Sequence, residues 1–390
     1  MHRLILLLLM LVTFLLLPDI YIYFVYITKK TKRRLLRLLY WVPALILLAG
    51  FLLLMLGDNA LARHPLAIGR YAVLVFLLII PKILFMLCSL VGWPFCYGLR
   101  WRRAPFTAAG LLLAVVSFGC VFYGATAGII RFDVKEVEFR HPRLPKGFDG
   151  YRMVQLSDIH TGSWTGDDAP MRRLVERVNA LHPDLILFTG DLVNQRATEL
   201  SEFQSVLSQL YAPDGVYSVL GNHDYGAYFH WKHDGEEKAN LDTLIAKEKQ
   251  MGWTLLDNDH RILYHRGDSL ALIGVGNYND RGAGVQHADL QQAIAGTDSL
   301  FSILLSHNPN HWRREVLPES NIALTLAGHT HAMQVVLFNH SLASLLFHEW
   351  RGMYSEGNRS LYVNVGIGYV GLPLRFGAWP EITVLTLKRQ

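Results

Sequence analysis

The sequence predicts an α/β domain at residues 131–390, preceded by an all-α module of four transmembrane helices at residues 1–130. Two observations support this division. Long apolar stretches are confined to the first 130 residues, whereas short apolar runs separated by helix-like segments follow them. The charge changes at the same point: residues 1–130 carry 13 Lys and Arg against 2 Asp and Glu, and residues 131–390 carry 24 against 30.

The composition excludes several classes of protein. Hydrophobic residues make up 51% of the chain and charged residues 18%. This is too apolar for a disordered chain. A soluble enzyme usually carries about a quarter charged residues, so part of this chain avoids water. The three cysteines predict no disulfide scaffold. The pI near 9.0 comes from the basic flanks of the apolar stretches, so we expect no nucleic-acid partner.

Four apolar stretches are each long enough to cross a bilayer, which takes about 20 helical residues. They are Leu4–Thr28, Leu39–Leu56, Tyr71–Gly98 and Phe106–Ile130. Aromatic residues near their ends are typical of the membrane interface. A signal peptide is the alternative for the first stretch. No small-x-small cleavage pattern follows it, and we therefore predict an uncleaved helix.

Basic residues predict the orientation of these helices. Segment 29–37 carries six and segment 100–103 carries three, whereas the opposite side carries only Arg3, Arg63 and Arg70. Cytoplasmic loops are enriched in Lys and Arg. We therefore expect a multi-pass protein of the plasma (inner) membrane, with both basic segments in the cytoplasm and the α/β domain outside it.

Two ionisable residues, Asp19 and Lys82, fall within the predicted spans, each beside a proline. Charges in lipid are costly and are often functional. No span offers a polar path for transport, however. We therefore expect a structural role, either as a pair or with Lys82 reaching toward the interface.

Short apolar runs after residue 130 predict the strands of the second part. They are Met153–Leu156, Leu185–Phe188, Val216–Leu220, Leu270–Val275, Ile303–Leu305, Ile322–Leu326, Leu361–Val365 and Ile382–Leu387. Before them, Arg131–Phe139 alternates apolar and charged residues, which also predicts a strand. Helix-like segments between some of them are Ala169–Leu181, Leu200–Leu210 and Leu241–Gln250. Strands that alternate with helices predict an α/β fold.

Polar residues with metal-binding side chains directly follow five of these runs. They are Asp158, His160, Asp191, Asn222, His307, His329 and His331. Open α/β sheets bind ligands at the carboxyl ends of their strands, so we expect these side chains to converge. Glycines at positions 190, 221 and 328 allow sharp turns and close approach of the main chain to an ion.

This set combines imidazole and carboxylate groups with one amide oxygen. Such a mixture suits Mn, Fe or Zn and is poor for Ca or Mg alone. Seven ligands are too many for one such ion, but they suit two ions about 3.5–4 Å apart that share a carboxylate. Two such ions activate a water for attack on phosphorus without a Ser or Cys nucleophile.

The ordered motifs D-x-H, G-D, G-N-H-D, H and G-H-x-H resemble those of the calcineurin-like metallophosphoesterase family, in particular its membrane-attached bacterial branch. The resemblance extends from Tyr151 to Leu387. It implies a four-layer α/β/β/α sandwich and a membrane-anchored phosphohydrolase with two divalent metal ions. It also implies cleavage of phosphate mono- or diesters by metal-activated hydroxide, and the choice between the two ester types stays open.

The resemblance also assigns a role to each motif residue. One ion is bound by Asp158, His160 and His331, the other by Asn222, His307 and His329, and Asp191 bridges them. His223 faces the substrate as proton donor or charge stabiliser, and Asp224 orients it.

Two positions depart from the family pattern: Asn194 stands where Asp is frequent, and Ala332-Met333 where two glycines are frequent. Neither is a ligand position, so both concern the substrate pocket.

Four other features leave alternatives open. Arg351 and Arg375 either contact substrate phosphate or form surface salt bridges. Segment 225–250, which begins with several aromatic residues, is either a lid over the metals or a solvated loop and helix. For His340–Trp350 we favour core packing over a membrane-facing patch.

Three functions compete. The first is the phosphohydrolase, for which a phosphorylated lipid or a lipid-linked sugar of the cell envelope is the substrate hypothesis, because the domain follows the last span so closely. The second is a non-catalytic binding scaffold that retains the phosphoesterase fold. We disfavour it because no ligand is missing. The third is a transporter, which the apolar spans disfavour.

Overall fold

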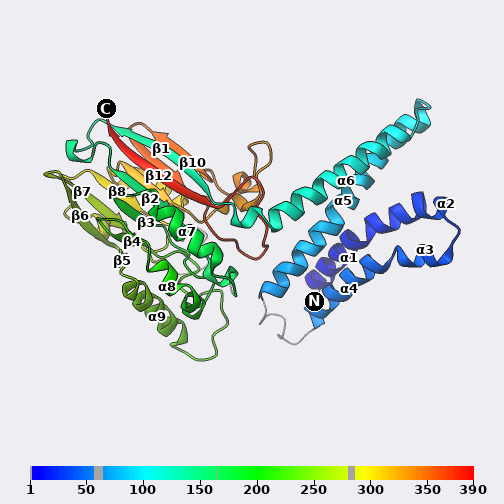
Figure 1. Cartoon of the computed structure of the whole chain (residues 1–390), viewed down its shortest axis with the longest axis horizontal. Coiled ribbons are helices and arrows are strands. Elements are labelled where there is room, and N and C mark those ends of the chain that lie inside the picture. Colours follow the sequence, from blue (N-terminus) through cyan, green and yellow to red (C-terminus); the bar gives the residue numbers. More distant parts are fainter. Residues whose placement is uncertain (1, 57–64, 165, 280–285) are drawn as a thin grey trace. The chain divides into compact units, whose positions relative to one another are not determined.

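A computed structural model describes residues 2–56, 65–164, 166–279 and 286–390 (Figure 1). Arg63, which entered the predicted orientation, lies outside the described residues. The chain divides into two compact units, one of Met1–Ala127 with Gly371–Leu374 and one of Gly128–Val370 with Arg375–Gln390. Each is described below by itself.

The first unit consists of apolar helices. They are α1 (His2–Ile22), η1 (Tyr23–Ile27), α2 (Thr28–Lys30), α3 (Arg34–Leu39), α4 (Val42–Leu56), α5 (Pro65–Gly98) and α6 (Ala104–Ala125). Within the described residues, four helical segments are long and apolar enough to cross a membrane: Val12–Lys30, Arg34–Leu54, Leu66–Gly98 and Ala104–Ile130. They overlap the four predicted stretches, so the prediction of four apolar helices is confirmed.

Asp19 and Lys82 form an ion pair between α1 and α5. The Lys82 Nζ lies 2.8 Å from Oδ1 of Asp19, whose side chain is fully buried. The Tyr40 hydroxyl donates to the main-chain oxygen of Asp19 at 3.0 Å. The two charges therefore pair with one another inside the helical unit, as one of the two structural alternatives predicts.

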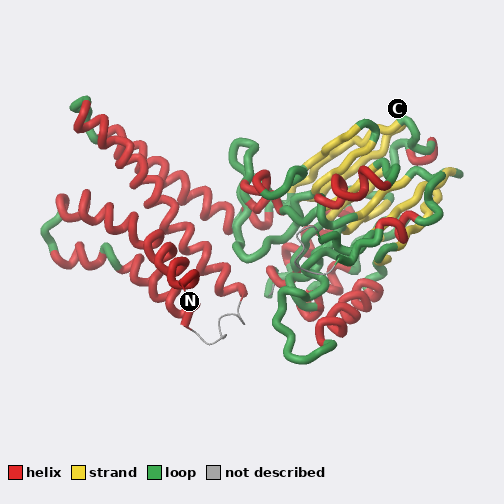
Figure 2. The backbone as a smooth tube through the Cα atoms, turned by 180° about the vertical axis from the view of Figure 1, so that it is seen from behind, coloured by secondary structure: helices red, strands yellow, loops and turns green. Residues whose placement is uncertain are grey.

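Within the described residues of the second unit, the strands form two sheets of six strands each (Figure 2). The first sheet has the order β1 (Asp133–His141), β12 (Glu381–Arg389), β2 (Arg152–Leu156), β3 (Leu185–Phe188), β4 (Val216–Ser218) and β5 (Thr254–Leu255). The second has the order β10 (Gly352–Glu356), β11 (Arg359–Val363), β9 (Leu324–Ala327), β8 (Ser302–Leu305), β7 (Asp268–Gly274) and β6 (Asp259–His265).

The sheets pack face to face, and helices cover their outer faces. On β3, Leu185 and Leu187 belong to the core between the sheets, whereas Ile186 and Phe188 point to the outer face, as the two-residue period of a strand requires. Helices α7 (Ala169–Asn179), α8 (Gln204–Leu207) and α9 (Glu236–Gln250) pack on the first sheet. On the second sheet lie α10 (Leu290–Ile294), η6 (Trp312–Val316) and α11 (Leu317–Glu319). The predicted four-layer α/β/β/α sandwich is confirmed.

Parallel pairing brings the ends of the motif-bearing strands to one edge of each sheet. In the first sheet β2, β3 and β4 are parallel neighbours, and in the second β7, β8 and β9 are. The predicted ligands follow β2, β3, β4, β8 and β9. The strand ends of both sheets therefore supply one site.

Candidate metal centre

The loops after β2 and β3 are held together by main-chain hydrogen bonds. The amide of Asp158 donates to Gly190 O at 2.9 Å, and that of His160 donates to Asp191 O at 3.1 Å. Asp158, His160 and Asp191 have φ angles of 53°, 49° and 60°. Residues other than glycine seldom adopt this left-handed conformation, and such strain is typical of functional sites.

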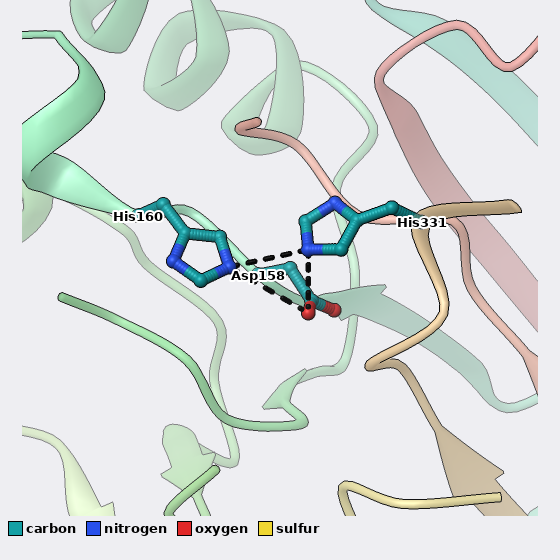
Figure 3. A group of neighbouring side chains, drawn as sticks. All are labelled: Asp158, His160 and His331. Atoms are coloured by element: carbon teal, nitrogen blue, oxygen red, sulfur yellow. Dashed lines mark hydrogen bonds and ion pairs between the residues drawn. The ribbon is translucent and has the colours of Figure 1, made fainter. Parts of the chain in front are cut away.

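Asp158, His160 and His331 form a first group of candidate ligands, all buried (Figure 3). The Nε2 atom of His331 lies 3.2 Å from Oδ1 of Asp158. It also lies 3.2 Å from Nε2 of His160. The three side chains point toward one another, although they come from different sheets.

Asp191, His307 and His329 form a second group. The Nε2 atom of His307 lies 3.1 Å from Oδ2 of Asp191 and 3.2 Å from Nδ1 of His329. Oδ1 of Asn222 lies 3.1 Å from the same nitrogen. The structure thus brings all seven candidate ligands close together.

The hydrogen bonding of His307 shows that this second group fits a cation. Its Nδ1 lies 2.7 Å from the carbonyl oxygen of Thr189, which can only accept. Nδ1 therefore carries the proton, and in the neutral ring Nε2 has a lone pair aimed at the oxygens of Asp191 and Asn222. Burial alone would lower the pKa of His307, but the charge of Asp191 more than offsets this effect and raises the pKa to about 9. Positive charge is therefore favoured between Nε2 of His307 and the oxygens of Asp191 and Asn222.

His329 is suited to bind a metal as a neutral ring. Burial, together with the charge of His307, lowers its pKa to about 3. A neutral imidazole retains the lone pair that metal binding needs.

Asp191 lies between the two groups. Its Oδ2 is 3.1 Å from Nε2 of His307 and 3.6 Å from Nε2 of His160. Its Oδ1 accepts a hydrogen bond from the amide of His223 at 2.9 Å. A Cβ atom at position 221 would lie 2.2 Å from this Oδ1, so the turn needs Gly221. Burial opposes ionisation, yet His307 and His223 hold the pKa of Asp191 well below its usual range.

Asp224 holds the loops rather than the ring of His223. Its Oδ2 accepts from the amides of Asp191 and Gly221, and its Oδ1 from those of Leu192 and Val193, at 2.8–3.1 Å. The expected orientation of His223 by Asp224 is therefore replaced by another contact. Nδ1 of His223 lies 2.7 Å from the carbonyl oxygen of Asn194.

Tyr228 contacts both residues of the G-N-H-D turn that face the site. Its hydroxyl accepts from Nδ2 of Asn222 at 3.0 Å, which leaves Oδ1 of Asn222 directed at His307. Its ring lies 4.6 Å from that of His223. The sequence draws attention to the aromatic residues after the turn, but it does not single out Tyr228.

Arg375 is fully buried, so it does not form the surface salt bridge that one of the two predictions assigns to it. It donates to three main-chain oxygens, of Gly368, Val365 and Ala378, and its Nη2 lies 2.9 Å from Nδ1 of His331. Because a guanidinium only donates, the proton of a neutral His331 is on Nε2, facing Asp158.

Ala332 and Met333 occupy the backbone positions where glycines are frequent in the family. Their φ angles are 48° and 45°. A residue with a Cβ atom costs roughly 1–2 kcal/mol in this conformation. Ala332 and Met333 therefore add strain to the turn after His331.

A buried carboxyl near the site predicts a pH dependence of stability. Burial raises the pKa of Glu248 on α9 from 4.5 to about 8, although Ser218 donates to it at 2.5 Å. The folded protein therefore prefers the protonated form. The corresponding stability is present below pH 4.5 and is lost as the pH rises through 8. We expect Glu248→Gln to unfold at a higher temperature than the wild type at pH 8.5, with a smaller difference at pH 5.

Thermal unfolding of the full chain in detergent at both pH values measures this effect. Asp242→Asn, which changes an exposed carboxylate on the same helix, is the control. Equal shifts at pH 5 and pH 8.5 for Glu248→Gln would contradict the raised pKa.

Comparison with known proteins identifies the family. Residues 151–333 match the family described as "Calcineurin-like phosphoesterase". The chain is also 33% identical over 291 residues to "Uncharacterized metallophosphoesterase YkuE" of Bacillus subtilis (strain 168), covering 72% of this chain and 93% of that protein. The chain belongs to the calcineurin-like phosphoesterase family.

The membrane unit of this calcineurin-like phosphoesterase also has relatives. Residues 2–129 match "Probable Calcineurin-like phosphoesterase, transmembrane domain". A "Transmembrane protein with metallophosphoesterase domain" of Danio rerio is 29% identical over 83% of this chain and 72% of its own length. An "Uncharacterized metallophosphoesterase" of Helicobacter pylori (strain ATCC 700392 / 26695) is 30% identical over 83% of this chain and 87% of its own length. The chain is therefore a metallophosphoesterase with a membrane domain.

Proposed function

We propose that this metallophosphoesterase is a dinuclear metal phosphohydrolase that cleaves phosphate mono- or diesters. The position of Asp191 carries the proposal, because its Oδ2 lies within 3.6 Å of histidine nitrogens from both ligand groups. A carboxylate so placed can bind two ions at once. Two ions that share a carboxylate suit in-line displacement at phosphorus.

The donor set suggests how two ions of Mn, Fe or Zn would be held. Asp158, His160 and His331 would hold one, Asn222, His307 and His329 would hold the other, and Asp191 would serve both. When bound, two divalent ions of this type lower the pKa of a water to about 7 and neutralise charge on phosphoryl oxygens.

His223 is the proposed proton donor to the leaving group. Its Nδ1 donates to the carbonyl oxygen of Asn194, so Nε2 is the atom that holds or delivers a proton. Its ring lies 4.8 Å from that of His160, beside the first ligand group. Asp224 supports the reaction indirectly, because it fixes the loops that carry Asp191 and His223.

The non-catalytic scaffold remains the competing hypothesis. A scaffold has no need of buried, strained ligand positions, yet Asp158, His160 and Asp191 retain their left-handed backbone. Such strain costs of order 1–3 kcal/mol per residue. Its persistence favours the enzyme.

The membrane unit supports the proposal of a lipid-linked substrate. We place the domain boundary between residues 130 and 131. Seven residues separate the end of α6 at Ala125 from the start of β1 at Asp133. Even fully extended they span only about 25 Å, so the domain stays near the bilayer. The nine basic residues of segments 29–37 and 100–103 support a location outside the cytoplasm.

The purified full-length protein tests the function directly. We expect two equivalents of metal and hydrolysis of nitrophenyl phosphate, bis-nitrophenyl phosphate or phosphatidic acid in mixed micelles. Two bound metals without turnover of any of these or of polyprenyl phosphates would favour the scaffold. A reporter fused after Gln390 tests the orientation, since activity of a strictly cytoplasmic reporter would reverse it.

A further inference from the structure

Exposed apolar side chains gather in the segment that follows the G-H-x-H motif. We call this set the apolar tip. It comprises Leu337, Phe338, Leu342, Leu345 and Leu346. Phe338 is 96% exposed and Leu345 78%. The prediction that His340–Trp350 packs into the core is therefore wrong for its leucines, whereas Phe347 is buried.

A tight turn presents Phe338 to its surroundings. Leu337 and His340 exchange main-chain hydrogen bonds of 2.9 Å, and the two residues between them, Phe338 and Asn339, have φ angles of 49° and 68°. Two-residue turns of this kind favour Asn or Gly, and a bulky aromatic in this conformation is an outlier. Neither burial of the side chain nor the backbone conformation therefore favours a phenylalanine at position 338.

The base of the segment is fixed to the metal centre. Ser341 Oγ donates to Ala332 O at 2.5 Å, and Thr330 Oγ1 donates to Trp350 O at 2.6 Å. The Phe347 ring lies 5.5 Å from that of His329. Whatever covers the apolar tip is therefore held close to the candidate ligands.

The segment that carries the apolar tip has no charged side chain that would suit a charged partner. Residues 329–348 contain no Asp, Glu, Lys or Arg, although residues 131–390 contain 54 of them. The first charged residues after it are Glu349, which is buried and paired with Arg313, and Arg351. The Arg351 guanidinium lies 4.8 Å from the centre of the Trp350 ring. Tryptophan and arginine at the border of an apolar surface are typical of a membrane interface.

We propose that the apolar tip inserts into the interfacial region of the lipid bilayer in which the chain's own helices lie. The short connection from α6 to β1 keeps the domain within reach of that bilayer. A second copy of the chain fits less well, because a stable protein interface takes about 20–30 residues a side. Resting on the proposed function, this contact specifies the substrate class: phosphate esters presented at the lipid surface, next to the metal centre.

Site-directed spin labelling of the full-length chain tests the contact without measuring activity. The protein is reconstituted in nanodiscs of phosphatidylethanolamine and phosphatidylglycerol at 3:1, with Cys88, Cys96 and Cys120 replaced by alanine. Labels are placed with Phe338→Cys and, in a second variant, Leu345→Cys. Tyr264→Cys on β6, whose side chain is 77% exposed, is the matched control.

Collisions with oxygen, which dissolves in lipid, and with a water-soluble nickel chelate distinguish the possible environments. We expect the ratio of oxygen to nickel collisions at residues 338 and 345 to exceed that at residue 264 severalfold. A ratio equal to that at residue 264 would overturn the proposal. So would protection from both reagents, which indicates protein contact, or spin–spin broadening, which indicates a second copy.

Kinetics then separate this inference from the proposed function. We expect Phe338→Asp to slow hydrolysis of phosphatidic acid in nanodiscs severalfold and to leave hydrolysis of nitrophenyl phosphate unchanged. If Phe338→Asp and the wild type hydrolyse both substrates at equal rates, the apolar tip has no role in substrate access. Failure of the wild type to hydrolyse either ester counts against the proposed function alone, because the spin-label result does not depend on it.

Discussion

Asp191→Asn should abolish turnover and lower the metal content below two equivalents while the fold survives. The neutral amide retains an oxygen for the amide of His223, but it removes the negative charge that both ligand groups share at Oδ2. Loss of one electrostatic contact to a transition state typically costs about 10²–10³-fold in rate. Because Asp191 would serve both ions in the proposed site, we expect at least that loss.

Metal analysis, thermal unfolding and hydrolysis of nitrophenyl phosphate measure the three quantities. Asp268→Asn is the control, because Asp268 also accepts a main-chain amide, that of Gly147, but lies at the start of β7. Normal activity with two bound metals in Asp191→Asn would remove Asp191 from its bridging role.

His223→Ala should retain both metals and lose about 10²–10⁴ in rate, the usual contribution of general acid–base catalysis. The ring is absent from both ligand groups, and its Nδ1 is held by Asn194 O. Proton donation matters most for poor leaving groups. The loss should therefore shrink for esters with very acidic leaving groups, such as nitrophenol.

A series of aryl phosphates of graded leaving-group pKa measures this dependence. Tyr228→Phe is a useful companion, since it retains the ring beside His223 and removes only the hydroxyl that accepts from Asn222. If His223→Ala loses the same factor for every ester, His223 stabilises charge rather than donating a proton.

The sequence predicts strands that have a continuous apolar run or a clear apolar–charged alternation, and it misses strands that have neither. Leu185–Phe188 is a continuous apolar run and is found as β3 at the same residues. By contrast, β6 (Asp259–His265) and β10 (Gly352–Glu356) are partly exposed and polar, so no apolar run reveals them. Hydrophobic pattern identifies a strand only where packing requires apolar side chains.

The ligand set is predictable from the sequence, but the groups that orient it are not. The motifs are short and contiguous, so Asp158 and His331 can be recognised one motif at a time. Arg375 and Asn194 act on His331 and His223 from distant parts of the chain. Such contacts depend on tertiary packing, and a sequence without its fold gives no signal for them.

Four main-chain amides donate hydrogen bonds to the carboxylate of Asp224, and this has a consequence for metal binding at the proposed site. They hold the loops that carry Asp191 and Gly221 through main-chain contacts that involve no metal. In the proposed site, the position of Asp191 is therefore set by the chain itself before any ion binds. If the site takes Mn, Fe or Zn as proposed, the choice among them would then depend on ligand chemistry and on the supply of each ion in the compartment where the domain folds.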